Sequence, residues 1–235
     1  MDRLFIRRLD YYIGNACIAF IKPFVFLLGK ILRIDHRPYL KKDLTVIKFL
    51  GGGSLIVAYP CLLGLRKQFP AIKLRLVTAD TTAPFAESMN IFDEILPVNS
   101  KNIFTIFLSE LNIYRKILFT DTVVDLEVYS RLSTFLSTLT LARNRIGFYL
   151  EDAFWRKDLS THLVYFNRAY GMYHFYEKLF SLFGIKPAAI EECRDRIGAV
   201  QRIQDLRWAL VLGFWQGAQD DRRPMGEGIW SAVDP

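Results

Sequence analysis

The chain has 235 residues, of which 51% are hydrophobic and 23% charged, with a formal net charge of +7. This composition supplies ample apolar side chains for a packed core and excludes general disorder. The three cysteines lie far apart without a C-x-x-C pair, which argues against a disulfide framework, a zinc site or another bound metal, and favours a reducing cytosol.

Residues 1–43 form a basic, apolar arm. Residues 1–44 carry a net charge of +5, whereas the remainder of the chain carries only +2. A nucleic-acid-binding protein usually carries its basic face on the folded domain, so this distribution favours an anionic membrane surface as partner and no nucleic acid. Ile13–Leu32 is strongly apolar, but Lys22-Pro23 at its centre and Lys30 near its end argue against a spanning helix.

The arm is interpreted first as an amphipathic helix that lies in the membrane interface and is broken near Pro23. A helix that packs on its own domain and a true transmembrane span are the alternatives. No small-residue cleavage site follows the apolar run, so the segment does not fit a signal peptide.

From Leu44 onward, strand and helix patterns alternate, which is typical of an α/β layer fold. The expected strands lie at 44–50, 73–78, 94–98, 123–126, 145–148 and 162–166. The expected helices lie at 54–69, 84–89, 103–116, 131–142 and 174–184. Continuously apolar strands predict a Rossmann-like α/β domain over residues 44–187, with a mainly parallel sheet and helices on both faces.

After Pro187 the alternation stops. A short helix is expected at 190–202, and 206–214 is apolar enough for one further element. Residues 216–235 are expected to be irregular, because their apolar surface is too small to offset a backbone ordering cost of about 1–2 kcal/mol per residue. We therefore interpret 188–235 as an aberrant tail from a truncated or frameshifted reading frame.

The first candidate site lies where the first strand ends, at Gly51, Gly52, Gly53 and Ser54. Glycines at this point let the backbone turn sharply and approach a ligand, and the start of the next helix offers free N–H groups to an anion or a sugar. The pattern is neither G-x-G-x-x-G nor a P-loop. A structural turn with Ser54 as the helix cap is the alternative.

The ordered set of motifs resembles the N-terminal domain of glycosyltransferase family 9, which includes the bacterial ADP-heptose:lipopolysaccharide heptosyltransferases. The similar segments are 46–62, 65–77, 92–97, 124–126 with Arg131, 145–147, and His174 with 182–184. The resemblance covers about residues 44–187 and implies the acceptor-side half of a GT-B fold. It also implies inverting transfer from a nucleotide-sugar such as ADP-heptose to a lipid-linked saccharide, without a cofactor, on the cytoplasmic face of a bacterial inner membrane.

The chain departs from the family at the position of its general base. The family has an Asp after the loop glycine, and this chain has Ser54. A hydroxyl without an adjacent base accepts a proton poorly near neutral pH, so this role is expected to have moved or been lost. Asp80, Asp125 and Glu127 are the substitute candidates, because ligand sites of open α/β sheets lie beyond the carboxyl ends of the strands. Structural roles for Asp80 and Asp125 are the alternative.

Basic side chains are the candidate acceptor contacts. They are Lys48, Arg131, Arg145, Arg168 and His174. The fork of an arginine suits phosphates and acidic sugars, although solvated surface arginines and a packing role for His174 are the alternatives. Lys48 either points to the cleft or neutralises Asp125.

A GT-B enzyme binds its nucleotide-sugar on a second domain of well over about 100 residues. Only 48 residues follow Pro187, so we expect this chain to lack the donor-binding half and to transfer no sugar alone. A non-catalytic, membrane-associated α/β binding protein that retains only the acceptor half is the alternative.

Overall fold

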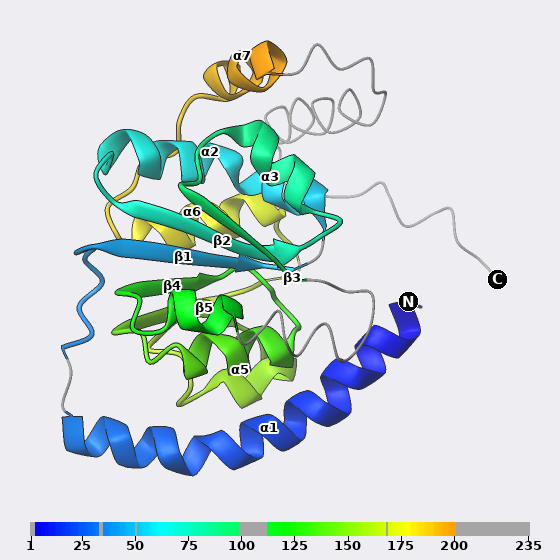
Figure 1. The fold of residues 1–235 in the computed structure, drawn as a ribbon, viewed down its shortest axis with the longest axis vertical. Helices are drawn as coiled ribbons and strands as arrows, with labels where there is room; N and C mark the ends of the chain where they lie inside the picture. Colours follow the sequence, from blue (N-terminus) through cyan, green and yellow to red (C-terminus); the bar gives the residue numbers. More distant parts are fainter. Residues whose placement is uncertain (1–2, 33–34, 50, 99–111, 168, 201–235) are drawn as a thin grey trace.

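The computed structural model describes residues 3–32, 35–49, 51–98, 112–167 and 169–200. Its centre is a six-stranded sheet in the order β3-β2-β1-β4-β5-β6, and every neighbouring pair is parallel. The strands are β1 (Asp43–Lys48), β2 (Lys73–Ala79), β3 (Glu94–Val98), β4 (Thr122–Asp125), β5 (Asn144–Tyr149) and β6 (His162–Tyr165). The predicted Rossmann-like, mainly parallel sheet is therefore confirmed (Figure 1).

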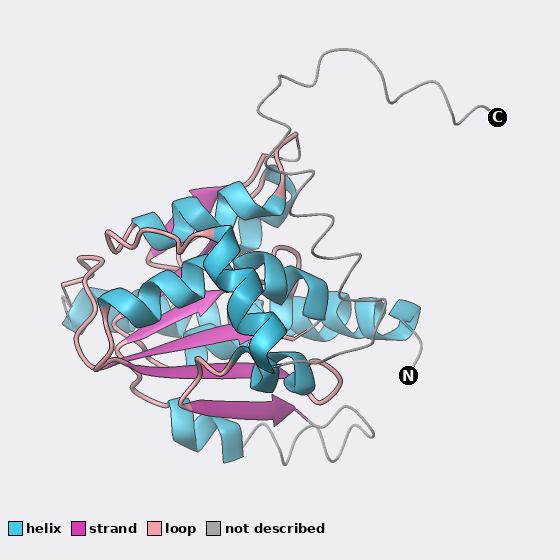
Figure 2. Ribbon diagram, turned by 90° about the horizontal axis from the view of Figure 1, so that it is seen from above, coloured by secondary structure: helices cyan, strands magenta, loops and turns pink. Residues whose placement is uncertain are grey.

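Helices cover both faces of this sheet, as predicted, and in Figure 2 they lie over strands that all point the same way. One face carries α2 (Gly52–Gln68), α3 (Ala83–Met89), α6 (Met172–Ser181) and α7 (Ile190–Val200). The other carries α5 (Arg131–Leu139), the helical residues 112–117 and the long α1 (Arg3–Leu32). The larger core lies on the side of α2 and α6.

The centre of the larger core is α2, whose residues 55–65 are all buried. Because α2 is covered by the sheet, α6 and α7, it is apolar around its whole circumference rather than along one stripe. Gly64 allows the chain before α7 to approach this helix closely. A Cβ at Gly64 would lie 2.1 Å from the backbone oxygen of Lys186, and the Ala188 N–H donates to the Pro60 carbonyl at 2.9 Å.

The N-terminal arm is one uninterrupted helix, so the expected break near Pro23 is wrong. It follows α5 along the domain (Figure 1), and its Ile18 and Ile21 are buried in a small cluster with Leu159. The packing surface supplied by the domain holds the helix continuous, which local sequence signals do not reveal. No helix among the described residues is both long and apolar enough to cross a membrane.

Several boundaries differ from those expected. β1 ends at Lys48 instead of continuing to residue 50, and α5 ends at Leu139 because Leu141 has a positive φ of 53°. The 3-10 helix η1 (Glu151–Arg156) was not predicted. The packed core also extends past residue 187, because Cys193 of α7 is fully buried in it. The expected elements at 103–111 and beyond 200 lie outside the described residues.

Candidate functional site

The glycine turn lies at the carboxyl end of β1, where α2 begins. Gly51 has φ 89°, a left-handed conformation that favours glycine, and a Cβ on Gly52 would lie 2.8 Å from the Phe85 ring. Nothing lies within 4 Å of a Cβ on Gly53. Ser54 is not the helix cap considered from the sequence, because the cap is Gly51 and the Ser54 hydroxyl donates to the Gly51 carbonyl at 2.8 Å.

Lys48 pairs with Glu127 across the carboxyl ends of β1 and β4. The Lys48 Nζ lies 2.9 Å from Glu127 Oε1, and the two side chains are only 7% and 15% exposed. The alternative in which Lys48 neutralises Asp125 is therefore wrong. The pair places one cation and one carboxylate together at the sheet edge that binds ligands in open α/β folds.

Asp125, the last residue of β4, is buried and only 3% exposed. Its carboxylate accepts hydrogen bonds from the Ser133 hydroxyl and the Glu127 N–H, both at 2.9 Å. Burial raises the pKa of Asp125 to about 6, against the opposing effect of the Arg156 guanidinium at 3.3 Å. A carboxylate with these contacts supports the loop beyond β4, which favours the structural alternative for Asp125.

Arg156, at the end of η1, is the side chain that the sequence did not reveal. It is fully buried, and its Nη2 donates to the backbone carbonyl of Glu127 and, at 3.4 Å, to that of Ser130. Its Nε and Nη1 have no hydrogen-bond partner. Arg156 therefore joins η1 to the loop that carries Glu127.

Two further polar side chains border the turn. Asp80 follows β2 on the other side of β1, and its Oδ1 accepts the Thr81 N–H at 2.8 Å. The Tyr176 hydroxyl on α6 is buried and makes no hydrogen bond, although the Ser54 side chain is its neighbour. Burial raises the pKa of Tyr176, so this phenol stays protonated as a hydrogen-bond donor.

Arg131 contacts the N-terminal helix rather than the glycine turn. Its guanidinium lies 4.7 Å from the ring centroid of Tyr11 and 3.9 Å from that of Trp155, and its Nε donates to Asn15 Oδ1 at 2.7 Å. A Cβ on Gly14 would lie 2.4 Å from the Arg131 Cβ, so the helix approaches very closely here. These contacts favour a role for Arg131 in holding α1.

Two further basic candidates that the structure describes, Arg145 and His174, make their contacts away from the turn. Arg145 is near the amino end of β5, and its side chain donates to the carbonyls of Leu159 at 2.7 Å and Ala142 at 2.8 Å. Burial lowers the pKa of Arg145. His174 is exposed on α6, 3.8 Å from Glu177, and Arg168 lies outside the described residues. Acceptor contacts by these three residues remain a prediction.

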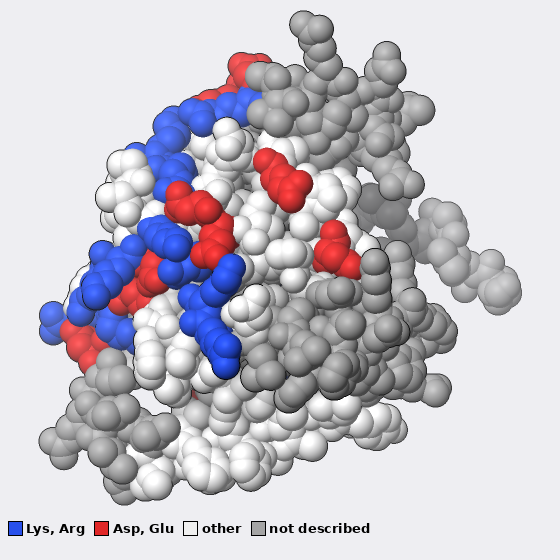
Figure 3. All heavy atoms as spheres, in the orientation of Figure 1, with Lys and Arg blue, Asp and Glu red and all other residues white. Residues whose placement is uncertain are grey.

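Positive charge is opposed by negative charge on the face shown in Figure 3, where Lys and Arg lie among Asp and Glu. Arg66 pairs with Asp93 at 2.6 Å, and Lys73 and Lys116 both contact Glu94. This face is therefore a neutralised surface rather than an unopposed basic patch.

The parallel sheet with a polar cluster at its carboxyl edge defines a Rossmann-like α/β protein. The fold is similar to a glycosyltransferase of family 9 from Veillonella parvula DSM 2008, with a TM-score of 0.54 and 20% identity, over 65% of this chain and 43% of that chain. It is also similar to E. coli heptosyltransferase WaaC with ADP, with a TM-score of 0.51 and 13% identity, over 62% and 48% of the two chains.

A second structure of WaaC, with ADP-2-deoxy-2-fluoro heptose, gives a TM-score of 0.50 and 12% identity, over 62% of this chain and 49% of that chain. No family model and no curated protein sequence matches the chain. The chain spans less than half the length of these structures. The expected similarity of fold to family 9 is confirmed, and identities this low establish the fold alone.

Proposed function

We propose that this chain provides the acceptor-binding domain of a glycosyltransferase that transfers a sugar from a nucleotide-sugar, similar to ADP-heptose, to a lipid-linked saccharide. The observation that carries the proposal is the Lys48–Glu127 pair beside the glycine turn, at the carboxyl edge of a sheet with the family 9 fold. In this proposal the nucleotide-sugar binds to a second domain, as expected for a GT-B enzyme.

Glu127 is the general base in the proposed reaction. It accepts the proton of the acceptor hydroxyl while the hydroxyl oxygen attacks the anomeric carbon and the nucleoside diphosphate leaves, which inverts that centre. Asp125 is too buried to reach a substrate, and the Ser54 hydroxyl donates its hydrogen bond to the Gly51 carbonyl. Lys48 keeps Glu127 in place, and Asp80 is the second candidate for the base.

Acceptor binding is tested with a double variant, Lys48→Met with Glu127→Gln, which removes both charges of the pair together. We expect the purified chain to bind nanodiscs that contain lipopolysaccharide truncated after its first heptose residue, which supplies a neutral sugar. We expect the variant to bind roughly tenfold more weakly, because the loss of charged hydrogen bonds costs about 1.5 kcal/mol. Surface plasmon resonance measures both affinities.

The matched control removes an exposed ion pair, with Lys67→Met and Glu192→Gln, whose atoms lie 2.7 Å apart on α2 and α7. This control is expected to bind as the unchanged chain does. Equal binding to nanodiscs with and without the saccharide lipid would contradict the proposal. With ADP-heptose added, sugar transfer by the 235-residue chain alone would contradict the expectation that donor binding requires a second domain.

A non-catalytic acceptor-binding protein is the second candidate function. It is favoured by Ser54 at the position of the family's Asp and by the engagement of its hydroxyl with Gly51. Both candidates bind the same lipid, and they differ in whether a donor-binding domain restores transfer that depends on Glu127.

We also propose that α1 attaches the domain to the cytoplasmic face of an anionic inner membrane. Its inner face is used for packing through Ile18 and Ile21, but its outer face leaves large apolar side chains exposed. These are Tyr12 at 70%, Phe20 at 70%, Phe24 at 52% and Leu27 at 57% exposure. An apolar face on a helix with a net charge of +4 suits a surface of anionic headgroups.

Phe20→Ser with Phe24→Ser tests this attachment without disturbing the packed side of α1. We expect vesicle binding to weaken at least about tenfold, because each inserted Phe contributes on the order of 1.5 kcal/mol or more. Sedimentation with vesicles that contain roughly 30% anionic lipid measures the effect. Added salt should weaken vesicle binding by the unchanged chain, because it screens the charges. Phe119→Ser, at a 71% exposed aromatic position outside α1, is the control. Equal binding by all three proteins would remove α1 as the attachment.

A further inference from the structure

Tyrosines occupy the carboxyl ends of the last two strands of the sheet. Tyr149 ends β5 and Tyr165 ends β6, and the two residues are partners in the strand register with ring centroids 6.2 Å apart. Tyr165 is 57% exposed and Tyr170, in the loop that follows, is 62% exposed. The exposed rings of Tyr165 and Tyr170 and the glycine turn lie at the same edge of the sheet, because the carboxyl ends of parallel strands share one edge.

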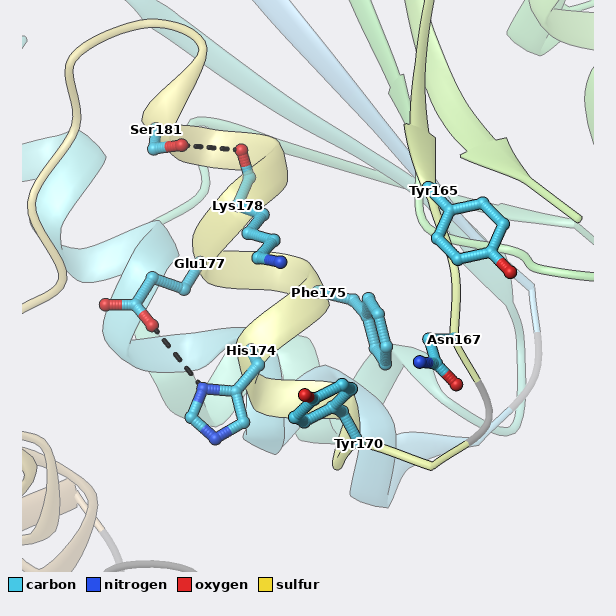
Figure 4. A pocket seen from close by; sticks show the side chains of 8 residues that line it. All are labelled: Tyr165, Asn167, Tyr170, His174, Phe175, Glu177, Lys178 and Ser181. Atoms are coloured by element: carbon cyan, nitrogen blue, oxygen red, sulfur yellow. Dashed lines mark hydrogen bonds and ion pairs between the residues drawn. The ribbon is translucent and has the colours of Figure 1, made fainter. Parts of the chain in front are cut away.

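These rings border a pocket of about 550 Å³ between the end of β6 and the outer side of α6 (Figure 4). This volume is in the range of about 300–1,000 Å³ that is usual for small-ligand sites. Phe175 forms an apolar floor, since it is only 2% exposed and packs on Phe166 with a centroid distance of 4.3 Å. The rim loop is stabilised by Asn167, whose Oδ1 accepts the Ala169 N–H at 3.0 Å.

The charged groups of the pocket nearly cancel. Glu177 and Lys178 lie next to each other in sequence on α6 and both line the pocket, and His174 is 3.8 Å from Glu177. An anion site would gather cations without a neighbouring carboxylate. Apolar rings combined with an amide, a carboxylate and an ammonium instead suit a neutral ligand that has both apolar C–H faces and many hydroxyl groups.

We propose that this pocket binds a neutral sugar unit of a saccharide acceptor. Only β5 separates β6 from β4, so further sugars of the same acceptor would extend along the carboxyl edge of the sheet toward the Lys48–Glu127 pair. The inference rests on the proposed acceptor function, and it adds the class of sugar and the second binding position. Tyr165 and Tyr170 supply the ring faces, while Asn167, Glu177 and Lys178 supply hydrogen bonds to the hydroxyl groups.

Saturation-transfer NMR on the full chain tests the pocket with three probes: maltotriose, chitotriose and trigalacturonic acid. We expect transfer to C–H protons of at least one of the two neutral trisaccharides, and weaker transfer to the acidic one. Tyr165→Ala and Tyr170→Ala should each weaken the affinity roughly two- to tenfold, whereas Tyr165→Phe, which keeps the ring, should retain it. Phe119→Ala, at a 71% exposed aromatic side chain before β4, is the control.

The pocket is overturned if neither neutral trisaccharide binds, or if binding is the same in the Tyr165→Ala and Tyr170→Ala variants as in the control. The proposed function would still be supported if binding to the saccharide-lipid nanodiscs depends on the Lys48–Glu127 pair. Conversely, tyrosine-dependent trisaccharide binding without nanodisc binding would support the pocket and contradict the proposed acceptor.

Discussion

Arg156→Met is expected to lower the free energy of unfolding by about 3–5 kcal/mol at pH 8, because it leaves a buried carboxylate without its cation. Arg156 is fully buried and contacts Asp125 at 3.3 Å. Without the guanidinium the pKa of Asp125 rises further above about 6, far from its ordinary value of 3.8. The loss of stability should therefore grow as the pH rises through this range and be smaller at pH 5, where the folded state binds the proton.

Urea unfolding at pH 5 and pH 8 measures this difference. The control variant combines Arg156→Met with Asp125→Asn, which removes the charge that Arg156 compensates, and it should recover part of the loss at pH 8. A loss below about 1 kcal/mol that does not depend on pH would show that the two charges are not coupled.

Gly64→Ala is expected to destabilise the domain by about 2–3 kcal/mol, although alanine favours a helix by about 1 kcal/mol over glycine. The added Cβ would lie 2.1 Å from the backbone oxygen of Lys186, and a backbone atom cannot rotate away as a flexible side chain can. Thermal unfolding measures the effect, and hydrogen exchange should show faster exchange of the Ala188 N–H, which is bonded to Pro60.

Gly53→Ala in the same helix is the matched control, because nothing lies within 4 Å of its Cβ. It should leave stability unchanged or raise it by up to about 1 kcal/mol. Similar effects of the two substitutions would mean that the segment before α7 does not pack against α2 as described.

The sheet was predictable because its signals are local. The strands are short segments, continuously or alternately apolar, between turns, and the sequence predicts the third strand at its observed bounds, Glu94–Val98. The glycines after the first strand predict a sharp turn, and the observed left-handed φ of Gly51 agrees with this prediction. The order of the strands along the sheet and their exclusively parallel pairing came from the structure.

The contacts of the site were much less predictable, because they join residues far apart in the chain. Lys48 and Glu127 are separated by 79 positions, so nothing near either residue reveals the pair. Arg156 lies in a segment without strand or helix periodicity, and its contact with Asp125 follows from tertiary packing. Pro23 indicated a broken helix, but packing against α5 overrides that local signal.

The residues against which α1 packs come more than 90 positions after it in the chain. Asn15 contacts Arg131, the first residue of α5, and His36 contacts the carbonyl of Arg143 beyond its end, so both helices run in the same direction. At a synthesis rate of about 5–20 residues per second, α1 precedes α5 on the ribosome by on the order of 5–20 s. During that interval neither apolar side of α1 has an intramolecular partner. If α1 attaches the domain to a bilayer as proposed, that attachment would begin before the domain has folded.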